Sequence, residues 1–238
     1  MTSAGPSFAG EVADAAAAHA VGPEYVSAVG KVVASHVRNE LAGAAAFDEP
    51  AIALAPGPKE KWLACRIAME EYGHHLKFQR LASELGLEDA ATGRALSVFD
   101  YGLSSWAEFV VLKALVDLAE VVLMEELLAT SYLPLRDLVS RLLPEERFHV
   151  SFGKAHAREL AAVPTARPVL QQAVDDLVSF TVPFFGRSAS TNNETFRRWG
   201  VKQQTNDEAR AQWAARCRQF VEEELGLRFP DVDPHWNG

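Results

Sequence analysis

The chain has 238 residues, of which 48% are hydrophobic and 23% charged, and its formal net charge at pH 7 is -9. This length and composition are typical of one large globular domain or two small ones, and they exclude wholesale disorder. The acidic balance argues against nucleic acid and anionic membrane surfaces as partners, because both require a basic footprint.

The N-terminal segment predicts neither a signal peptide nor a membrane anchor. Its first residues include Glu11 and Asp14 but no lysine or arginine, so they lack the basic region that opens a signal peptide. The most apolar stretch, residues 109–124, is interrupted by charged residues and does not predict a membrane span. Cys65 and Cys217 lie far apart and predict no disulfide framework. We therefore expect a cytoplasmic protein with no membrane partner.

Four long stretches have apolar residues at the three- and four-residue spacing of a helix. Pro23 suits the first turn of the first stretch, and Gly86 suits the end of the second. Ser104 or Ser105 can cap the third stretch, and Pro134 opens the fourth. We expect these helices over residues 23–46, 58–85, 105–130 and 132–160.

The remaining segments are shorter and richer in proline, glycine and polar residues. No run shows the apolar–polar alternation of a half-buried strand. The sequence therefore predicts an all-α fold, a bundle of four long helices with additional C-terminal helices, in a single domain over residues 1–238. We further expect a loop at 48–58, a polar connector with room for a short helix at 87–103, a helix at 168–180, an irregular segment at 183–194, a helix from an Asn206 cap to Leu225, and a loop at 230–238.

Two of the long helices each contain a glutamate followed three residues later by a histidine. The pairs are Glu71 with His74 and Glu146 with His149. Residues three apart share one face of a helix, so each pair can present a carboxylate oxygen and an imidazole nitrogen to one point. Two such pairs, with one carboxylate from each of two further helices, are the ligand set of ferritin-like di-iron proteins.

The other two long helices supply the two further carboxylates. Glu40 follows an apolar face on the first helix, and Asp117 lies within an apolar stretch of the third. Glu40 precedes Glu71 by 31 residues and Asp117 precedes Glu146 by 29, which matches one helix, a turn and a return to the same height. Glu120 is expected beside the metals without binding them. The predicted metal ligands are Glu40, Glu71, His74, Asp117, Glu146 and His149.

Each of these residues also has a simpler interpretation when it is taken alone. A single Glu-x-x-His pair on a helix is most often a solvated polar pair, and Glu40 alone is typical of an exposed helix position. Asp117 or Glu120 could instead pair with an arginine. The other histidines have no acid three residues before them, and both cysteines are typical of small buried residues, so we expect no ligands among them. The coincidence of all these positions on four helices favours the metal site.

Short motifs along the chain also resemble a known family. They are HVRNE at 36–40, EEYGH at 70–74, SWAE at 105–108, LVD at 115–117, EERFH at 145–149, WGVK at 199–202 and TNDE at 205–208. With these motifs the chain resembles the catalytic subunits of bacterial phenylacetyl-CoA epoxidases, which are ferritin-like di-iron monooxygenases, and more distantly the oxygenase of benzoyl-CoA epoxidase. The resemblance spans most of the chain, and the family's six ligands fall on the six residues predicted above.

The resemblance implies two iron ions (Fe²⁺/Fe³⁺) as the cofactor, and O2 and a small aromatic molecule as substrates. The aromatic ring would be epoxidised or hydroxylated, with the substrate carried as a CoA thioester. A separate reductase is implied, because the sequence contains neither a glycine-rich dinucleotide loop nor an iron–sulfur cysteine set. We also expect an oligomer, formed by this chain alone or with a related helical subunit.

Two positions depart from the family pattern. The family has a lysine where this chain has Ile67, and an alanine where it has Glu120. Both positions lie close to predicted ligands. The substrate can therefore differ from that of the family while the metal chemistry stays the same. The alternatives are a diverged di-iron oxygenase or desaturase of a biosynthetic pathway that acts on a non-CoA small molecule, and a non-catalytic or iron-handling ferritin-like protein.

Overall fold

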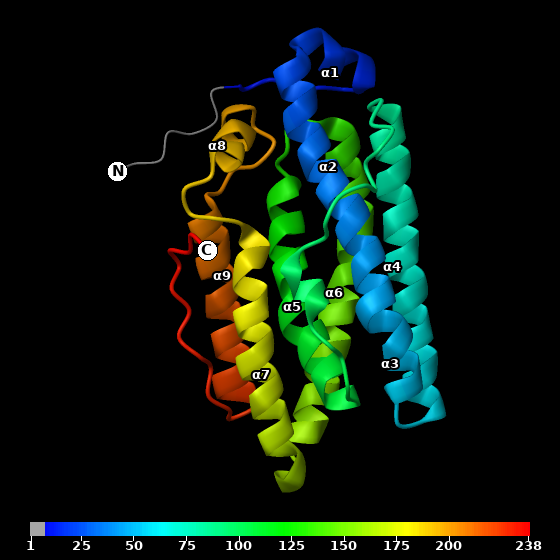
Figure 1. Cartoon of the computed structure of the whole chain (residues 1–238), viewed down its shortest axis with the longest axis vertical. Coiled ribbons are helices and arrows are strands. Elements are labelled where there is room, and N and C mark those ends of the chain that lie inside the picture. The colour runs from blue at the N-terminus through cyan, green and yellow to red at the C-terminus, as the bar shows by residue number, and fades with distance from the viewer. Residues whose placement is uncertain (1–7) are drawn as a thin grey trace.

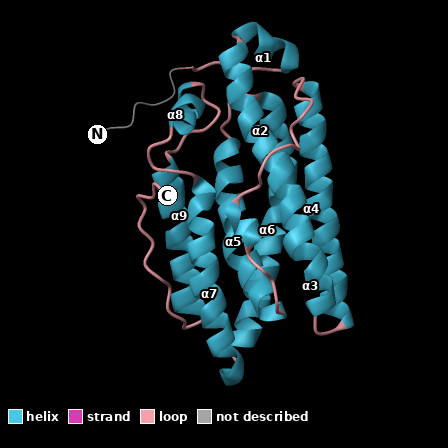
Figure 2. Cartoon of the chain, in the orientation of Figure 1, coloured by secondary structure: helices cyan, strands magenta, loops and turns pink. Residues whose placement is uncertain are grey.

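Four long helices run side by side in the computed structural model, which describes residues 8–238 (Figure 1). Within these residues there is no strand, and a single isolated bridge joins Val12 to Tyr132 (Figure 2). The predicted all-α, ferritin-like bundle is therefore confirmed. None of the helices in the described part of the chain is both long and apolar enough to cross a membrane. The long helices are α2 (Pro23–Gly43), α4 (Pro58–Glu84), α5 (Trp106–Leu127) and α6 (Leu133–Ala161).

The ends of these helices follow the local sequence. The side chain of Ser105 accepts a hydrogen bond from the backbone N–H of Glu108, which caps α5 as predicted. Pro23 and Pro58 lie in the first turns of α2 and α4, where a missing backbone N–H costs nothing. Pro144 lies inside α6 on its exposed side, and the helix continues past it.

The connection between α2 and α4 is more helical than its prolines predict. A π-helical turn (Ala44–Asp48) leads directly into α3 (Glu49–Leu54), so the expected loop at 48–58 is wrong for most of its length. Pro50 lies in the first turn of α3, where proline is tolerated. Because the chain stays helical here, Asp48 points into the bundle and is 1% exposed.

The C-terminal third adds three helices and corrects two further expectations. α8 (Thr191–Arg198) begins inside the segment expected to be irregular. Thr205, not Asn206, caps α9 (Asn206–Gln219): it forms a capping box with Glu208, while the Asn206 side chain donates to the carbonyl of Arg187 at 2.8 Å. A π-helical turn then extends α9 to Glu224, close to the expected end. The helices outside the four-helix core are α1 (Ala15–Val21), α7 (Arg167–Thr181), α8 (Thr191–Arg198) and α9 (Asn206–Gln219).

Helix α5 forms the centre of the molecule and is buried around most of its circumference. It lies between the α2–α4–α6 side of the bundle and the α7–α9 side (Figure 1). Gly153 lets α6 approach it closely, because a Cβ there would lie 2.5 Å from the backbone nitrogen of Ala114. On the other side, the indole N–H of Trp213 donates to the carbonyl of Leu115 at 2.7 Å. These contacts fix α5, and with it the acids it carries.

Candidate metal centre

The six predicted ligands lie together, midway along α4, α5 and α6 and in the last turn of α2. Each is 0 to 8% exposed. Acids buried in this way are unfavourable unless they are paired or bound to a metal. The burial of these side chains together therefore favours a shared cation. They are Glu40 of α2, Glu71 and His74 of α4, Asp117 of α5, and Glu146 and His149 of α6.

The six side chains divide into two overlapping groups. In each group, one potential ligand atom per residue lies within 4.8 Å of all the others. The His74 group contains Glu40, Glu71, His74 and Glu146, and the His149 group contains Glu71, Asp117, Glu146 and His149. Two carboxylates belong to both groups. This is the arrangement expected of two neighbouring metal ions that share bridging glutamates.

Several ligand atoms face one another without the geometry of a hydrogen bond. The Nδ1 atom of His74 lies 2.8 Å from Oε1 of Glu146, and Nδ1 of His149 lies 3.1 Å from Oε1 of Glu71. Among residues 8–238, neither Nδ1 atom has a hydrogen-bond partner, nor does Oε1 of Glu146. A neutral imidazole nitrogen and a carboxylate oxygen repel at such distances unless a proton or a metal ion lies between them. The residues present therefore fit a metal centre.

The outer nitrogens of the two histidines are held in a reciprocal arrangement. His74 of α4 contacts Glu145 of α6 through Nε2 at 2.7 Å, while His149 of α6 contacts Glu70 of α4 through Nε2 at 2.9 Å. With Nε2–H donated to a carboxylate, Nδ1 is left to face the centre, as a metal ligand requires. Sequence reasoning assigned no role to Glu70 or Glu145, although the doubled glutamate in both motifs was a visible signal.

A buried lysine also reaches the centre, which the sequence did not predict. Nζ of Lys113 lies 2.8 Å from Asp48, 3.1 Å from Glu71 and 3.0 Å from Asp117. Burial alone would lower the pKa of Lys113, but the three acids outweigh it and hold the pKa well above its usual value. The simple interpretation that Asp117 pairs with an arginine is therefore wrong. Its cationic partner is a lysine one turn earlier on the same helix.

Glu120 pairs with a histidine instead of an arginine. Its Oε1 atom lies 2.9 Å from Nδ1 of His36, which is 3.8 Å from Oε1 of Glu40 and stacks on the ring of Phe78. Burial lowers the pKa of His36, but Glu120 and Glu40 outweigh it and raise the pKa to about 9, so the charged form of His36 is favoured at neutral pH. The sequence predicts a structural role for His36. In the folded chain it lies beside the candidate ligand Glu40 and pairs with Glu120, which is 84 positions away.

A count of charges shows how many metal ions the centre can neutralise. When the two ligand histidines, His74 and His149, are neutral, the four predicted carboxylate ligands give the centre a charge of -4. The charged side chains around them cancel in pairs, so two divalent ions would leave the centre neutral. The surrounding pairs are Lys113–Asp48, His36–Glu120, Arg66–Glu70 and Lys77–Glu145.

In the metal-free chain, protons offset part of this negative charge. Burial raises the pKa of Glu40 to about 7, although neighbouring histidines lower it. Burial also raises the pKa of Asp117 well above its usual value, against the effect of Lys113. Burial would lower the pKa of His74, but contacts with Glu146 and Glu40 raise it to about 11. A metal ion must displace these protons, so metal binding is expected to strengthen as the pH rises.

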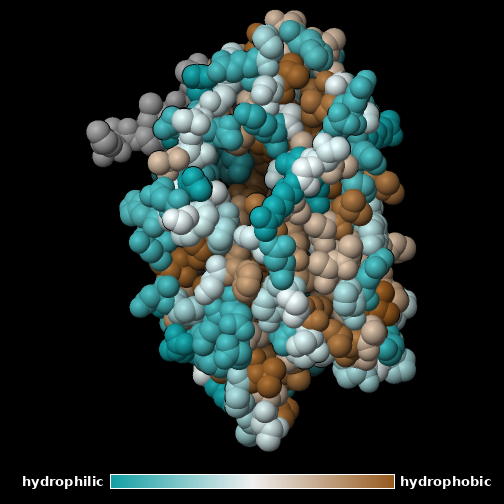
Figure 3. All heavy atoms as spheres, viewed as in Figure 1, coloured by the Kyte–Doolittle hydropathy of each residue, from teal (hydrophilic) through white to brown (hydrophobic). Residues whose placement is uncertain are grey.

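A cavity of about 670 Å³ opens beside the centre on the face shown in Figure 3. It lies between α2, α5, α8 and the 87–96 connector, and much of its wall is leucine and phenylalanine. A smaller pocket of about 50 Å³ lies further in, against Glu40, Asp117 and Lys113. Asn39, Glu120 and Phe184 line both the cavity and the smaller pocket. The cavity therefore leads towards the candidate ligands.

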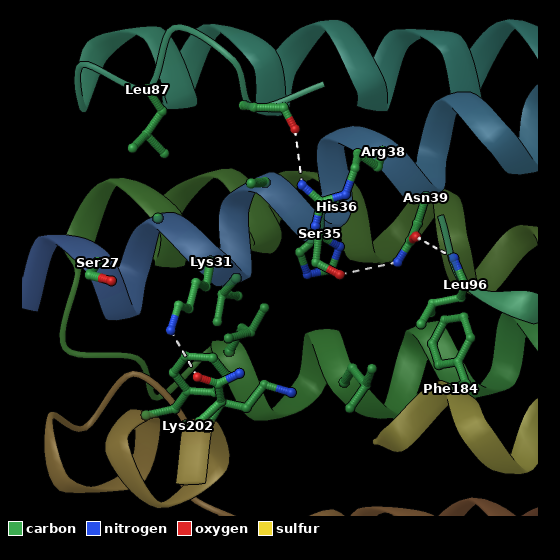
Figure 4. A pocket seen from close by; sticks show the side chains of 18 of the residues that line it. Ser27, Lys31, Ser35, His36, Arg38, Asn39, Leu87, Leu96, Phe184 and Lys202 are labelled. Carbon is green, nitrogen blue, oxygen red and sulfur yellow. Dashed lines mark hydrogen bonds between the residues drawn. The ribbon is translucent and has the colours of Figure 1, made fainter. Parts of the chain in front are cut away.

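Three basic side chains line the outer part of this cavity. Lys31 donates to the side chain of Asn192 at 2.8 Å, and Arg38 donates to the carbonyl of Ala90 at 3.2 Å (Figure 4). Lys202, from the WGVK motif, is the third. Its loop is anchored by Glu126, whose carboxylate accepts hydrogen bonds from the next two backbone N–H groups. This motif had no predicted role, and the structure gives it one in building the cavity wall.

The comparisons with known proteins identify the family of the chain. The family model described as "Phenylacetic acid catabolic protein" matches residues 9–238. The chain is 30% identical over 197 residues to one of the subunits of the 1,2-phenylacetyl-CoA epoxidase of Escherichia coli (strain K12), a match that covers 78% of the chain and 63% of that relative. The chain thus spans less than two thirds of the relative's length. The family match over nearly the whole chain shows that it belongs to the phenylacetic acid catabolic protein family.

Proposed function

We propose that this chain is an O2-dependent oxygenase subunit with a di-iron centre, and that it adds one oxygen atom to an aromatic ring. The observation that carries the proposal is the pair of overlapping ligand groups that share Glu71 and Glu146. The name of the curated relative, an epoxidase subunit, supports the type of reaction. A bundle that only stored iron would not need a cavity with an apolar wall leading to the ligands.

Each residue of the centre has a separate task in this proposal. Glu40, Glu71, His74 and Glu146 would hold one ion, and Glu71, Asp117, Glu146 and His149 would hold the other. Glu70 and Glu145 orient the histidine rings from outside. Iron held by carboxylate and imidazole ligands supplies O2 activation when it is bound.

The substrate would bind in the cavity with its ring inward. Leucine and phenylalanine side chains surround the ring, and the amide of Asn39 is fixed there by Ser35 and by the backbone of Leu96 (Figure 4). The basic side chains Lys31 and Arg38 on the outer wall suit a substrate with an anionic tail, such as a CoA thioester.

The overall reaction needs electrons that this chain does not supply. Ring, O2, two electrons and two protons give the epoxide and one water, so a reductase must deliver the electron pair. The sequence contains neither a glycine-rich dinucleotide loop nor an iron–sulfur cysteine set. The word "subunit" in the relative's name supports assembly with other chains, and we include a related helical subunit in the proposal.

Single-turnover oxygenation tests the proposal without knowledge of the reductase. The protein is loaded with Fe²⁺ under anaerobic conditions and then mixed with ¹⁸O2 and either phenylacetyl-CoA or phenylacetate. We expect one labelled oxygen atom in the ring-oxygenated product from one of the two substrates, and none with Glu146→Ala. Consumption of O2 with no labelled product from either substrate would contradict the proposal and favour an iron-handling protein.

A further inference from the structure

Lys113 shares two carboxylate oxygens with one of the two candidate metal positions. Its side chain is 2% exposed, and its ammonium nitrogen lies 3.1 Å from Oε1 of Glu71 and 3.0 Å from Oδ2 of Asp117. The same two oxygens lie 3.1 and 3.9 Å from Nδ1 of His149. A metal ion bound by the His149 group would therefore have the ammonium group on its own ligand atoms.

The His74 group is bordered differently. Apart from the Lys113 contact with the shared Glu71, the cation beside this group is His36, whose Nδ1 atom lies 3.8 Å from Oε1 of Glu40. The short contact of His36, at 2.9 Å, is to Glu120, which belongs to neither group. The charge of His36 is thus offset mainly by another acid. The two metal positions, alike in ligand types, differ in the positive charge they face.

We infer that Lys113 is a resident counter-ion of the His149 group, which keeps Glu71 and Asp117 together in the metal-free protein and opposes the second metal ion. The His74 position then fills first and the His149 position second, with weaker affinity. This inference rests on the proposed di-metal centre and goes beyond it, because it assigns an order of loading and a positioning residue.

Electrostatics gives the expected size of the effect. A monovalent ammonium and a divalent ion that share ligand oxygens repel strongly in a site with an effective dielectric constant near 20. Even after Lys113 adjusts its position, removal of its charge should tighten the second binding step by about tenfold or more. Asp48 lies 2.8 Å from the ammonium group and offsets part of its charge. Removal of the Asp48 charge should therefore have the opposite effect and weaken the second step.

The inference is tested by stepwise Mn²⁺ titration of the metal-free protein by calorimetry. In the wild type we expect two steps, the second weaker than the first. Lys113→Met should tighten the second step about tenfold or more, and Asp48→Asn should weaken it. The control Lys154→Met removes a half-buried lysine of α6 that packs 5.0 Å from the Phe220 ring, and it should leave both steps unchanged.

Thermal unfolding of the metal-free variants gives a second readout. Lys113→Met leaves Asp48 buried without its partner, so the midpoint should fall by about 5 °C or more. If this variant does not fold, the double variant Lys113→Met/Asp48→Asn also removes the Asp48 charge that Lys113 balanced, and its second step should be tighter than that of Asp48→Asn alone; a second step no tighter than that of Asp48→Asn would refute the inference.

The outcomes separate this inference from the proposed function. A wild type that binds no metal refutes the di-metal proposal and the inference with it. A wild type that binds two ions, with a second step that is unchanged or weaker in Lys113→Met, refutes the inference alone. If Lys113→Arg then restores a weakened step, the lysine only positions its acids and does not compete with the metal.

Discussion

Removal of the Glu70 carboxylate should weaken metal binding by the His149 group about 10- to 100-fold. Glu70 contacts Nε2 of His149 at 2.9 Å and is itself held by Arg66 at 2.8 Å. Without it, the outer N–H of the ring has no acceptor inside the bundle, and the ring can turn Nδ1 away from the centre. The expected loss corresponds to about 1.4 to 2.7 kcal/mol of binding free energy.

The matching residue on the other helix provides an internal comparison. Glu145 contacts His74 at 2.7 Å, but its side chain is 35% exposed, against 14% for Glu70. Water can replace a lost acceptor more readily at the more exposed position. We therefore expect Glu145→Ala to have the smaller effect on affinity, and Glu70→Gln, which keeps an acceptor, to fall between Glu70→Ala and the wild type.

The assay is a Co²⁺ titration in competition with a chelator, followed by visible absorption. The control is Glu84→Ala, which removes an exposed acid at the end of α4 that pairs with Arg80. The reasoning is refuted if Glu70→Ala binds Co²⁺ as tightly as this control does, or if Glu145→Ala loses more affinity than Glu70→Ala.

Three further predictions concern the ligands, the protons and the packing. Asp117→Ala should lose one ion per chain and Glu120→Ala should retain both, as measured by metal analysis; the reverse result would exchange their roles. Metal affinity should rise by about tenfold or more per pH unit between pH 6 and 9, because the pKa of His74 is raised to about 11 and its proton must leave; a flat profile by calorimetry would contradict this. Gly153→Ala should destabilise the fold by about 1 to 3 kcal/mol in urea unfolding, since its Cβ would meet the α5 backbone at 2.5 Å; unchanged stability would show that α6 shifts freely.

The centre was predictable where its pattern lies within one helix. The i, i+3 spacing of Glu71 with His74, and of Glu146 with His149, predicts a shared face directly. Asp117 was predictable as a ligand because it is an acid within an apolar stretch. Its spacing to Glu146 also matches one helix, a turn and a return to the same height. These positions depend on local geometry, which the sequence specifies.

The surrounding ion pairs were not predictable in the same way. Asp48 and Lys113 are 65 positions apart, and each alone is typical of an exposed helix residue. The prolines near Asp48 also predict a loop there, whereas Pro50 lies in the first turn of α3. Contacts between distant helices depend on how the helices turn against one another, and no single-sequence pattern carries that information.

The capping of α9 shows the same limit on a smaller scale. The sequence predicts Asn206 as the N-cap, but the adjacent Thr205 is an equally suitable residue type. The structure selects Thr205 because Glu208 completes the capping box and because Asn206 is needed at the carbonyl of Arg187. The second reason is a tertiary contact.

The number of metal ions per chain tests the central claim most directly. The wild type, loaded with Fe²⁺ under anaerobic conditions and freed of excess metal, should contain two ions per chain. Because Glu71 and Glu146 belong to both ligand groups, Glu71→Ala or Glu146→Ala should lose both ions, whereas Glu40→Ala or His149→Ala should retain about one. A wild type with fewer than two ions, or a Glu71→Ala variant that retains two, would contradict the account.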